Sequence, residues 1–213
     1  MPRLSCSVQI KPQVLRQINA DRSTRAATMY APLLLLLALF AQAASANDTL
    51  WQRLKTEPNL VVLMRHTHAA GGNPVAWDET GGCAGELMLT PKGRTSAKKI
   101  GEAFAQQNIK PTVISSPMCR CRETARIAFG EAAITDPDLR EIASADPNRT
   151  ANFERKAQSL IASHRGASPL IFVSHRPNID LLSLQLIDDG VLLVARSSAN
   201  GEVTVLGTLT LPP

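Results

Sequence analysis

Residues 61–67 read Val-Val-Leu-Met-Arg-His-Thr, an apolar run that ends abruptly in an arginine and a histidine. Such a run is typical of a buried strand in a parallel sheet. A second copy, Leu-Ile-Phe-Val-Ser-His, occupies residues 170–175. Open α/β sheets bind ligands at the carboxyl ends of their strands, so both histidines are expected at one sheet edge. Arginine beside histidine at that edge indicates an anionic ligand.

Strand and helix patterns alternate through most of the chain after residue 60. Strands are expected at 60–64, 111–115 and 170–174, with a terminal hairpin of 191–195 and 203–209 around Asn200-Gly201. Helices are expected from Thr90-Pro91 onward, at 118–129 and 151–164, and from Pro177 to about Leu186. This alternation predicts a three-layer α/β/α sandwich with a mostly parallel central sheet.

Residues 67–88 form a Gly-rich polar segment between the first strand and the first of these helices. A loop of this length inside a compact domain is usually functional or disordered. Two roles are open for Trp77 in this segment: its ring belongs to the core, or it stacks on a substrate.

The first 46 residues are predicted to be a signal peptide. Residues 31–40 are an apolar stretch too short to span a bilayer, and Ala44-Ser45-Ala46 is a cleavage pattern preceded by a basic segment. We therefore expect a periplasmic or secreted domain at 47–213 that is not inserted in the membrane after cleavage. Two alternatives stay open at this point, a start at Met29 and an uncleaved membrane anchor.

Charge and length restrict what the remaining 167 residues are. The full 213-residue chain has 23 Lys and Arg against 18 Asp and Glu. Removing residues 1–46 leaves 18 against 17, so the basic character belongs mostly to the leader. No basic stripe with interleaved aromatic residues is present in the sequence, which argues against nucleic acid as a partner. The length suits one domain.

Three cysteines lie beyond the leader, at Cys83, Cys119 and Cys121. An exported chain permits a disulfide. Cys119 and Cys121 are too close in sequence to pair easily with each other, so we expect Cys83 to pair with one of them. A zinc site would need a fourth ligand and different spacing.

A third segment, Ser115–Ala125, follows a predicted strand and opens a helix. The free N–H groups of a helix N-terminus favour phosphate, and Arg120 lies in the first turn. This segment therefore adds a second arginine to the edge that carries the two histidines.

With this segment the chain resembles the histidine phosphatase superfamily, also called phosphoglycerate mutase-like or histidine acid phosphatases. The resemblance covers about residues 60–180. It rests on four blocks in order: Arg65-His66-Thr67 for Arg-His-Gly, Leu89–Ala97 for Leu-Thr-x-x-Gly-Arg-x-x-Ala, Ser115–Ala125 for Ser-Ser-Pro-x-x-Arg-x-x-x-Thr-Ala, and Phe172–His175 for the second histidine. Thr67 stands where the family usually has glycine.

The resemblance implies hydrolysis through a phosphohistidine. His66 is the expected nucleophile, and Arg65, Arg120 and His175 are expected to hold the phosphoryl oxygens. The cations should also disfavour protonation of His66. No metal and no other cofactor is expected, because the arginines neutralise the charge.

The proton donor is predicted from Leu139-Arg140-Glu141, which is similar to the Leu-x-Glu segment of one family branch. Glu141 is therefore the candidate. The other branch places an acid directly after the second histidine, where this chain has Arg176. Three further acidic residues are kept as reserves: Asp138, Asp146 and Glu86.

The sequence thus predicts an exported phosphatase acting on a small-molecule or glycan phosphomonoester, including sugar or lipopolysaccharide-core phosphates. The alternatives are a phosphomutase of the same superfamily, a non-catalytic module that binds phospho-ligands, and a metal site using His66 and His68. The sequence leaves the oligomeric state open.

Overall fold

The computed structural model describes residues 46–130, 133–142 and 146–211. The predicted signal peptide lies outside these ranges except for Ala46, which begins the described helical stretch 46–56. Among the described residues, none of the helices combines the length and the apolar character needed to cross a bilayer.

A six-stranded sheet organises the domain in the order β5-β4-β6-β1-β7-β8. Its strands are β1 (Leu60–Arg65), β4 (Thr112–Ser115), β5 (Ile134–Thr135), β6 (Leu170–Ser174), β7 (Leu192–Ser197) and β8 (Val203–Leu209). The first four of these run parallel, while β7 and β8 are antiparallel to their neighbours. The prediction of a mostly parallel sheet is confirmed, and the terminal hairpin extends it beyond β1.

Alternate residues of the central strands build two separate cores, one on each face of the sheet. Val62 and Met64 of β1 belong to one core, and Val61 and Leu63 to the other. Because both faces are covered, β1 and β6 are continuous apolar runs without the alternation of a half-exposed strand. The predicted α/β/α sandwich is therefore confirmed.

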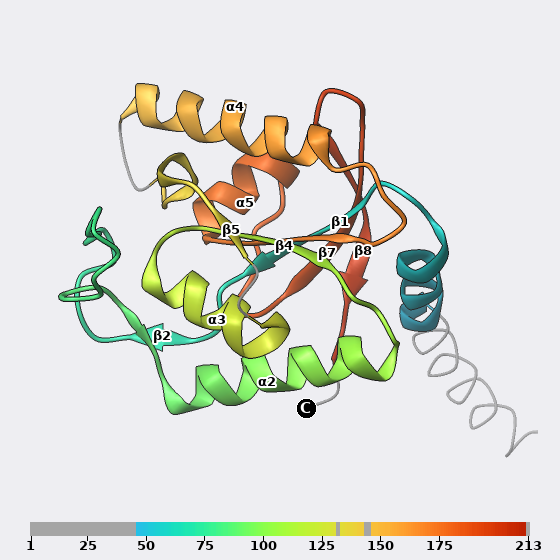
Figure 1. Ribbon diagram of the computed structural model, residues 1–213, viewed down its shortest axis with the longest axis horizontal. Helices are drawn as coiled ribbons and strands as arrows, with labels where there is room; N and C mark the ends of the chain where they lie inside the picture. Colours follow the sequence, from blue (N-terminus) through green and yellow to red (C-terminus); the bar gives the residue numbers. More distant parts are fainter. Residues whose placement is uncertain (1–45, 131–132, 143–145, 212–213) are drawn as a thin grey trace, which may run out of the picture. The chain divides into compact units, whose positions relative to one another are not determined.

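Helices cover both faces of the sheet, as Figure 1 shows. The first face packs against the stretch 46–56, α2 (Pro91–Gln106) and α3 (Cys119–Phe129). The other face packs against α4 (Pro147–Ser163) and α5 (Arg176–Ser183).

Local capping explains where these helices begin and end. The Thr90 side chain accepts the N–H of Gly93 and starts α2 where the sequence predicts it. Helix α4 begins four residues earlier than predicted, because Asp146 accepts the N–H groups of Asn148 and Arg149. Helix α5 ends before the predicted Leu186, at Leu184 with a left-handed φ of 56°.

The Gly-rich segment is closed at its base and tied down at its far end. The short strands β2 (Ala69–Ala70) and β3 (Met88–Leu89) pair antiparallel. Cys83 forms a disulfide with Cys119 at the start of α3, and Cys121 remains a buried free thiol. The expected pairing of Cys83 is confirmed, and its partner is Cys119.

We predict that removing this disulfide destabilises the domain by about 2–4 kcal/mol, since the cross-link closes a long loop and restricts the unfolded chain. Urea unfolding of Cys83→Ser, followed by circular dichroism, measures the change. Dithiothreitol should destabilise the unmodified protein and leave Cys83→Ser unchanged. Equal stability with and without reductant in the unmodified protein would contradict the prediction.

Candidate active site

The register of the parallel strands brings three loop residues to one edge of the sheet. Arg65 at the end of β1 pairs with Ser174 at the end of β6, so His66 and His175 follow neighbouring strands. Their ring centroids lie 5.5 Å apart. Ser116 follows β4 and donates its backbone N–H to the Val173 carbonyl. The predicted convergence of the two histidines is therefore observed.

The hydrogen bonds of His66 define which nitrogen carries the proton. Nδ1 lies 2.9 Å from the Thr67 carbonyl, which only accepts, so Nδ1 is the protonated atom. Nε2 then keeps its lone pair and accepts the Nε–H of Arg120 at 3.2 Å. Burial lowers the pKa of His66 to about 4, and the charges of Arg120 and Arg65 act in the same direction. The cations contribute as predicted, but burial is the larger cause.

His175 is fully buried between groups from three elements. Its Nε2 lies 2.7 Å from Ser116 Oγ, and the buried Cys121 sulfur lies 3.6 Å from the same atom. Burial, followed by the charge of Arg120, holds the pKa of His175 well below its usual value. Burial also raises the pKa of the Cys121 thiol. His175 therefore acts as a neutral hydrogen-bonding group rather than a cation, and Cys121 stays protonated.

Arg120 lies at the centre of the cluster, with only 1% of its side chain exposed. Its Nη2 contacts Glu141 Oε2 at 2.5 Å and the Pro74 carbonyl at 3.1 Å. Its Nη1 is buried and makes no hydrogen bond within the described residues. A buried donor without a protein acceptor is suited to an oxygen of a bound anion.

Arg65 is held by the segment that precedes β7. Its Nη2 pairs with Asp189 at 3.0 Å, and its Nη1 donates to the Ile187 carbonyl at 3.4 Å. Its Nε is buried without a partner in the described part of the chain. The two arginines thus offer free donors beside the two histidines. Asp189 carries no motif by which the sequence alone reveals it.

Glu141 is the predicted acid that the fold brings to this cluster. Its Oε2 lies 2.5 Å from Arg120 Nη2 and 3.9 Å from His175 Nδ1. Burial raises its pKa, although the charges of Arg120 and Arg65 oppose the shift. A carboxyl with a raised pKa retains its proton to higher pH, as a general acid requires.

The three reserve acids have other partners. Glu86 accepts the Cys119 N–H at 2.7 Å, at the N-terminus of α3. Asp146 caps α4. Asp138 lies in the 3₁₀ helix η1 (Pro137–Leu139), where its charge acts on Lys156. Within the described residues, none of the three acids forms a hydrogen bond or ion pair with His66 or His175, and Glu86 Oε1 is buried without a partner there.

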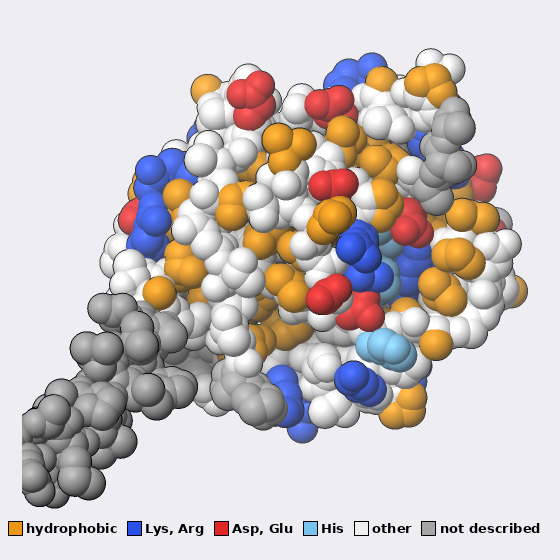
Figure 2. Space-filling view, turned by 180° about the vertical axis from the view of Figure 1, so that it is seen from behind, with side chains coloured by type: hydrophobic (Ala, Val, Ile, Leu, Met, Phe, Trp, Pro, Cys, Tyr) orange, Lys and Arg blue, Asp and Glu red, His pale blue; other side chains and the backbone are white. Residues whose placement is uncertain are grey.

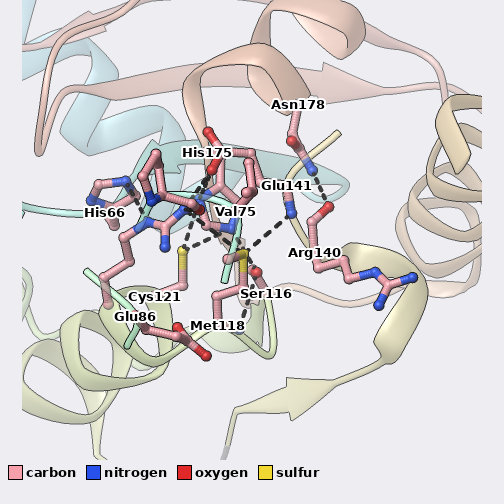
Figure 3. A network of polar contacts seen from close by, with 12 residues as sticks. His66, Val75, Glu86, Ser116, Met118, Cys121, Arg140, Glu141, His175 and Asn178 are labelled. Atoms are coloured by element: carbon pink, nitrogen blue, oxygen red, sulfur yellow. Dashed lines mark hydrogen bonds and ion pairs between the residues drawn. The ribbon is translucent and has the colours of Figure 1, made fainter. Parts of the chain in front are cut away.

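Asn178 holds the segment around Glu141, a contact that sequence reasoning missed. Its Oδ1 accepts the Ile142 N–H at 3.0 Å, and its Nδ2 donates to the Arg140 carbonyl at 3.0 Å. Asn178 is fully buried in α5, the helix that follows His175. One side chain therefore fixes the backbone on both sides of Glu141, and Figure 3 shows its contact with Arg140. Only its position three residues after His175 hints at this role.

The threonine at the usual glycine position fits without strain. Thr67 is fully buried, and its N–H donates to Thr124 Oγ1 of α3 at 3.2 Å. Its φ is not among the positive values found at non-glycine residues of the described chain. The substitution therefore links the His66 loop to α3.

The alternative of a metal site at His66 and His68 can be compared with the contacts that these two rings make. Both ring nitrogens of His66 are engaged, with Thr67 and Arg120. His68 Nδ1 contacts Thr90 Oγ1 at 2.8 Å, at the start of α2. Within the described residues, no three His, Cys, Asp or Glu side chains group as metal ligands would. His68 thus joins the loop to α2.

Figure 2 shows one face of the domain on which Lys or Arg, His and acidic side chains gather beside hydrophobic ones. Residues 61–159 match the sequence family described as the histidine phosphatase superfamily, branch 1. Over this stretch the chain is similar to members of that superfamily.

Solved structures share the fold of this domain. The protein histidine phosphatase SixA, complexed with tungstate, matches with a TM-score of 0.52 and 16% identity, over 71% of this chain and 96% of its own. The TTHB049 protein of Thermus thermophilus matches with a TM-score of 0.50 and 19% identity, over 71% of this chain and 99% of its own. Comparison with curated proteins finds no match.

We predict that His66 is neutral at pH 6, with its proton on Nδ1. The chain has four histidines, so ¹⁵N-detected NMR of the ring nitrogens can resolve it. The pKa should be about 4, because burial disfavours the charged ring. Arg120→Gln should raise this pKa by removing a nearby positive charge. A ring protonated on Nε2 at pH 6 would contradict the assignment.

Proposed function

We propose that this domain is a phosphatase that hydrolyses phosphomonoesters through a phosphohistidine on His66. One observation carries the proposal. The unprotonated Nε2 of His66 contacts Arg120, and both Arg120 and the adjacent Arg65 keep a buried N–H donor unpartnered in the described part of the chain. A nucleophile with a free lone pair next to donors suited to oxyanions is the arrangement that phosphoryl transfer to nitrogen requires.

In the first step, His66 Nε2 attacks phosphorus and forms an N–P bond. The phosphoryl group takes the place of the Arg120 contact on Nε2, and its oxygens accept from Arg120, Arg65 and His175. The P–O ester bond breaks with its electron pair going to the ester oxygen. Glu141 gives its carboxyl proton to that oxygen, so the product leaves as an alcohol.

In the second step, water replaces the departed alcohol. Its oxygen attacks phosphorus while the Glu141 carboxylate takes its proton. The N–P bond breaks, its electron pair returns to Nε2, and inorganic phosphate leaves. The Nδ1 proton stays on His66, directed at the Thr67 carbonyl, so both steps use the same tautomer of the ring.

The two rival functions place different demands on the site. A non-catalytic module needs no proton donor, yet the backbone of Glu141 is held on both sides by the buried Asn178. A mutase needs the same donor and additionally a phosphoenzyme shielded from water. We favour hydrolysis, with sugar or lipopolysaccharide-core phosphates as substrates to test first.

We also propose that the phosphatase domain is exported, as residues 31–46 of the sequence predict. The Cys83–Cys119 disulfide supports this proposal, because disulfides persist in oxidising compartments. Fractionation of cells expressing the full chain tests it, and mass spectrometry of the product locates the cleavage.

Trapping the intermediate tests the function. After brief incubation with a ³²P-labelled phosphomonoester and alkaline quenching, we expect label on His66, because phosphohistidine is stable in alkali and labile in acid. His66→Ala should lose the label and all turnover, whereas His164→Ala, at the far end of α4, should retain both. Turnover by folded His66→Ala would overturn the proposal. Label with transfer to a second alcohol, and no phosphate release, would indicate a mutase.

The choice of leaving group tests Glu141. Protonation of a poor leaving group contributes roughly 10²- to 10⁴-fold, and nitrophenolate needs it far less. Glu141→Gln should therefore slow hydrolysis of a sugar phosphate much more than that of 4-nitrophenyl phosphate. Asn178→Ala should show the same imbalance to a smaller degree, because it loosens the segment around Glu141. Equal loss on both substrates would mean that Glu141 positions the site without protonating the product.

A further inference from the structure

Two arginines beside Glu141 have no acidic partner of their own among the described residues. Arg140 precedes Glu141, and Arg149 lies in the first turn of α4. The Nε atoms of both are buried and make no hydrogen bond within that part of the chain. Neither side chain is engaged by the reaction proposed above. Half-buried guanidinium groups normally find acceptors, so the unmet donors call for an explanation.

Arg140 is held against the Gly-rich loop that also reaches the phosphate site. Its Cζ lies 4.3 Å from the centre of the Trp77 ring. Three residues earlier in the loop, the Pro74 carbonyl accepts from Arg120. The Arg140 carbonyl is fixed from the other side by Asn178. The guanidinium of Arg140 is therefore placed outside the phosphate site yet tied to the same two elements that shape it.

The charge of Arg149 interacts with that of Arg140 and with residues of the candidate site. Burial, followed by the charge of Arg140, lowers the pKa of Arg149, whereas Asp146 and Glu141 favour its charged form. Asp146 is occupied at the start of α4, where its Oδ1 accepts two backbone N–H groups. The charge of Arg149 also acts on Glu141 and on His175. Arg149 is thus close enough to Arg140, Glu141 and His175 for its charge to act on all three.

Arg140 and Arg149 repel each other and form no ion pair within the described residues, and a bound anion offsets that repulsion. We propose that Arg140 and Arg149 form a second anion subsite beside the phosphate site. The preferred substrates are then phosphomonoesters that carry a second anionic group, a phosphate or a carboxylate, on the leaving alcohol. The proposal rests on the phosphatase function above and specifies its substrate class.

A series of synthetic substrates tests this subsite. Each member is a linear alkanol phosphate of two to six carbons whose far end is a hydroxyl, a carboxylate or a phosphate. The chain length scans the spacing between the two sites, and the end group separates a phosphate preference from a carboxylate preference. We expect kcat/KM to be at least tenfold higher for an anionic end than for the hydroxyl end at one spacing or more.

Matched charge removals assign the preference to these arginines. Arg149→Gln and Arg140→Gln should each reduce the ratio of anionic-end to hydroxyl-end kcat/KM at least fivefold. Arg155→Gln removes the same charge from the same helix, but its side chain is exposed and contacts only Asn152, so the ratio should stay unchanged. The ratio in the unmodified protein should also fall as salt is raised.

The outcomes separate this proposal from the phosphatase function. No preference for an anionic end at any spacing overturns the subsite, as does a preference that survives both substitutions or falls equally in Arg155→Gln. If no member is hydrolysed, the phosphatase function fails. Calorimetric titration of the same compounds then decides the subsite: binding of the bisphosphate must exceed that of the monophosphate tenfold, and Arg149→Gln must abolish the difference.

Discussion

The buried guanidinium of Arg120 is the group around which this site is arranged. It reaches His66 with Nε and Glu141 with Nη2, so one side chain joins the proposed nucleophile to the proposed acid. A guanidinium buried this deeply needs acceptors, and the Glu141 carboxyl lies 2.5 Å from its Nη2. The same burial that requires these acceptors also lowers the pKa of His66 and raises that of Glu141. Packing and chemistry in the site therefore have one physical origin.

The surroundings of Arg120 keep it in place. It lies in the first turn of α3, directly after Cys119, which the disulfide ties to the Gly-rich loop. The buried carboxylate of Glu86 accepts the N–H of Cys119, and the Thr124 hydroxyl, one turn further along α3, contacts the backbone of Thr67. The loop, the helix and the end of β1 are thus connected through α3. A long polar loop, which would otherwise be free to move, becomes one wall of the site.

The opposite wall depends on α5 and on the segment before α4. Asn178 fixes the backbone around Glu141 through two hydrogen bonds. One of them is to the Arg140 carbonyl, so the backbone position of Arg140 is fixed as well. The Arg140 guanidinium stacks on the ring of Trp77 in the Gly-rich loop. The inner arginines have partners in Glu141 and Asp189, whereas Arg140 and Arg149 have no acidic partner in the described chain. This difference between Arg120 and Arg65, which have acidic partners, and Arg140 and Arg149, which have none there, underlies the proposed recognition of a second anionic group.

The sequence by itself determined the sheet and the side chains at its edge. Apolar runs that end in Arg65-His66 and in His175 specify buried strands, and parallel strands must end at the same edge, so the two histidines meet. The strand-to-helix pattern added Arg120, and the resemblance to a known family added Glu141. Only the tertiary structure decided that Cys119 pairs with Cys83, which nitrogen of His66 keeps its lone pair, and that Asn178 and Asp189 support the site. Those features depend on distances between segments far apart in the chain, and no local propensity or spacing encodes such distances.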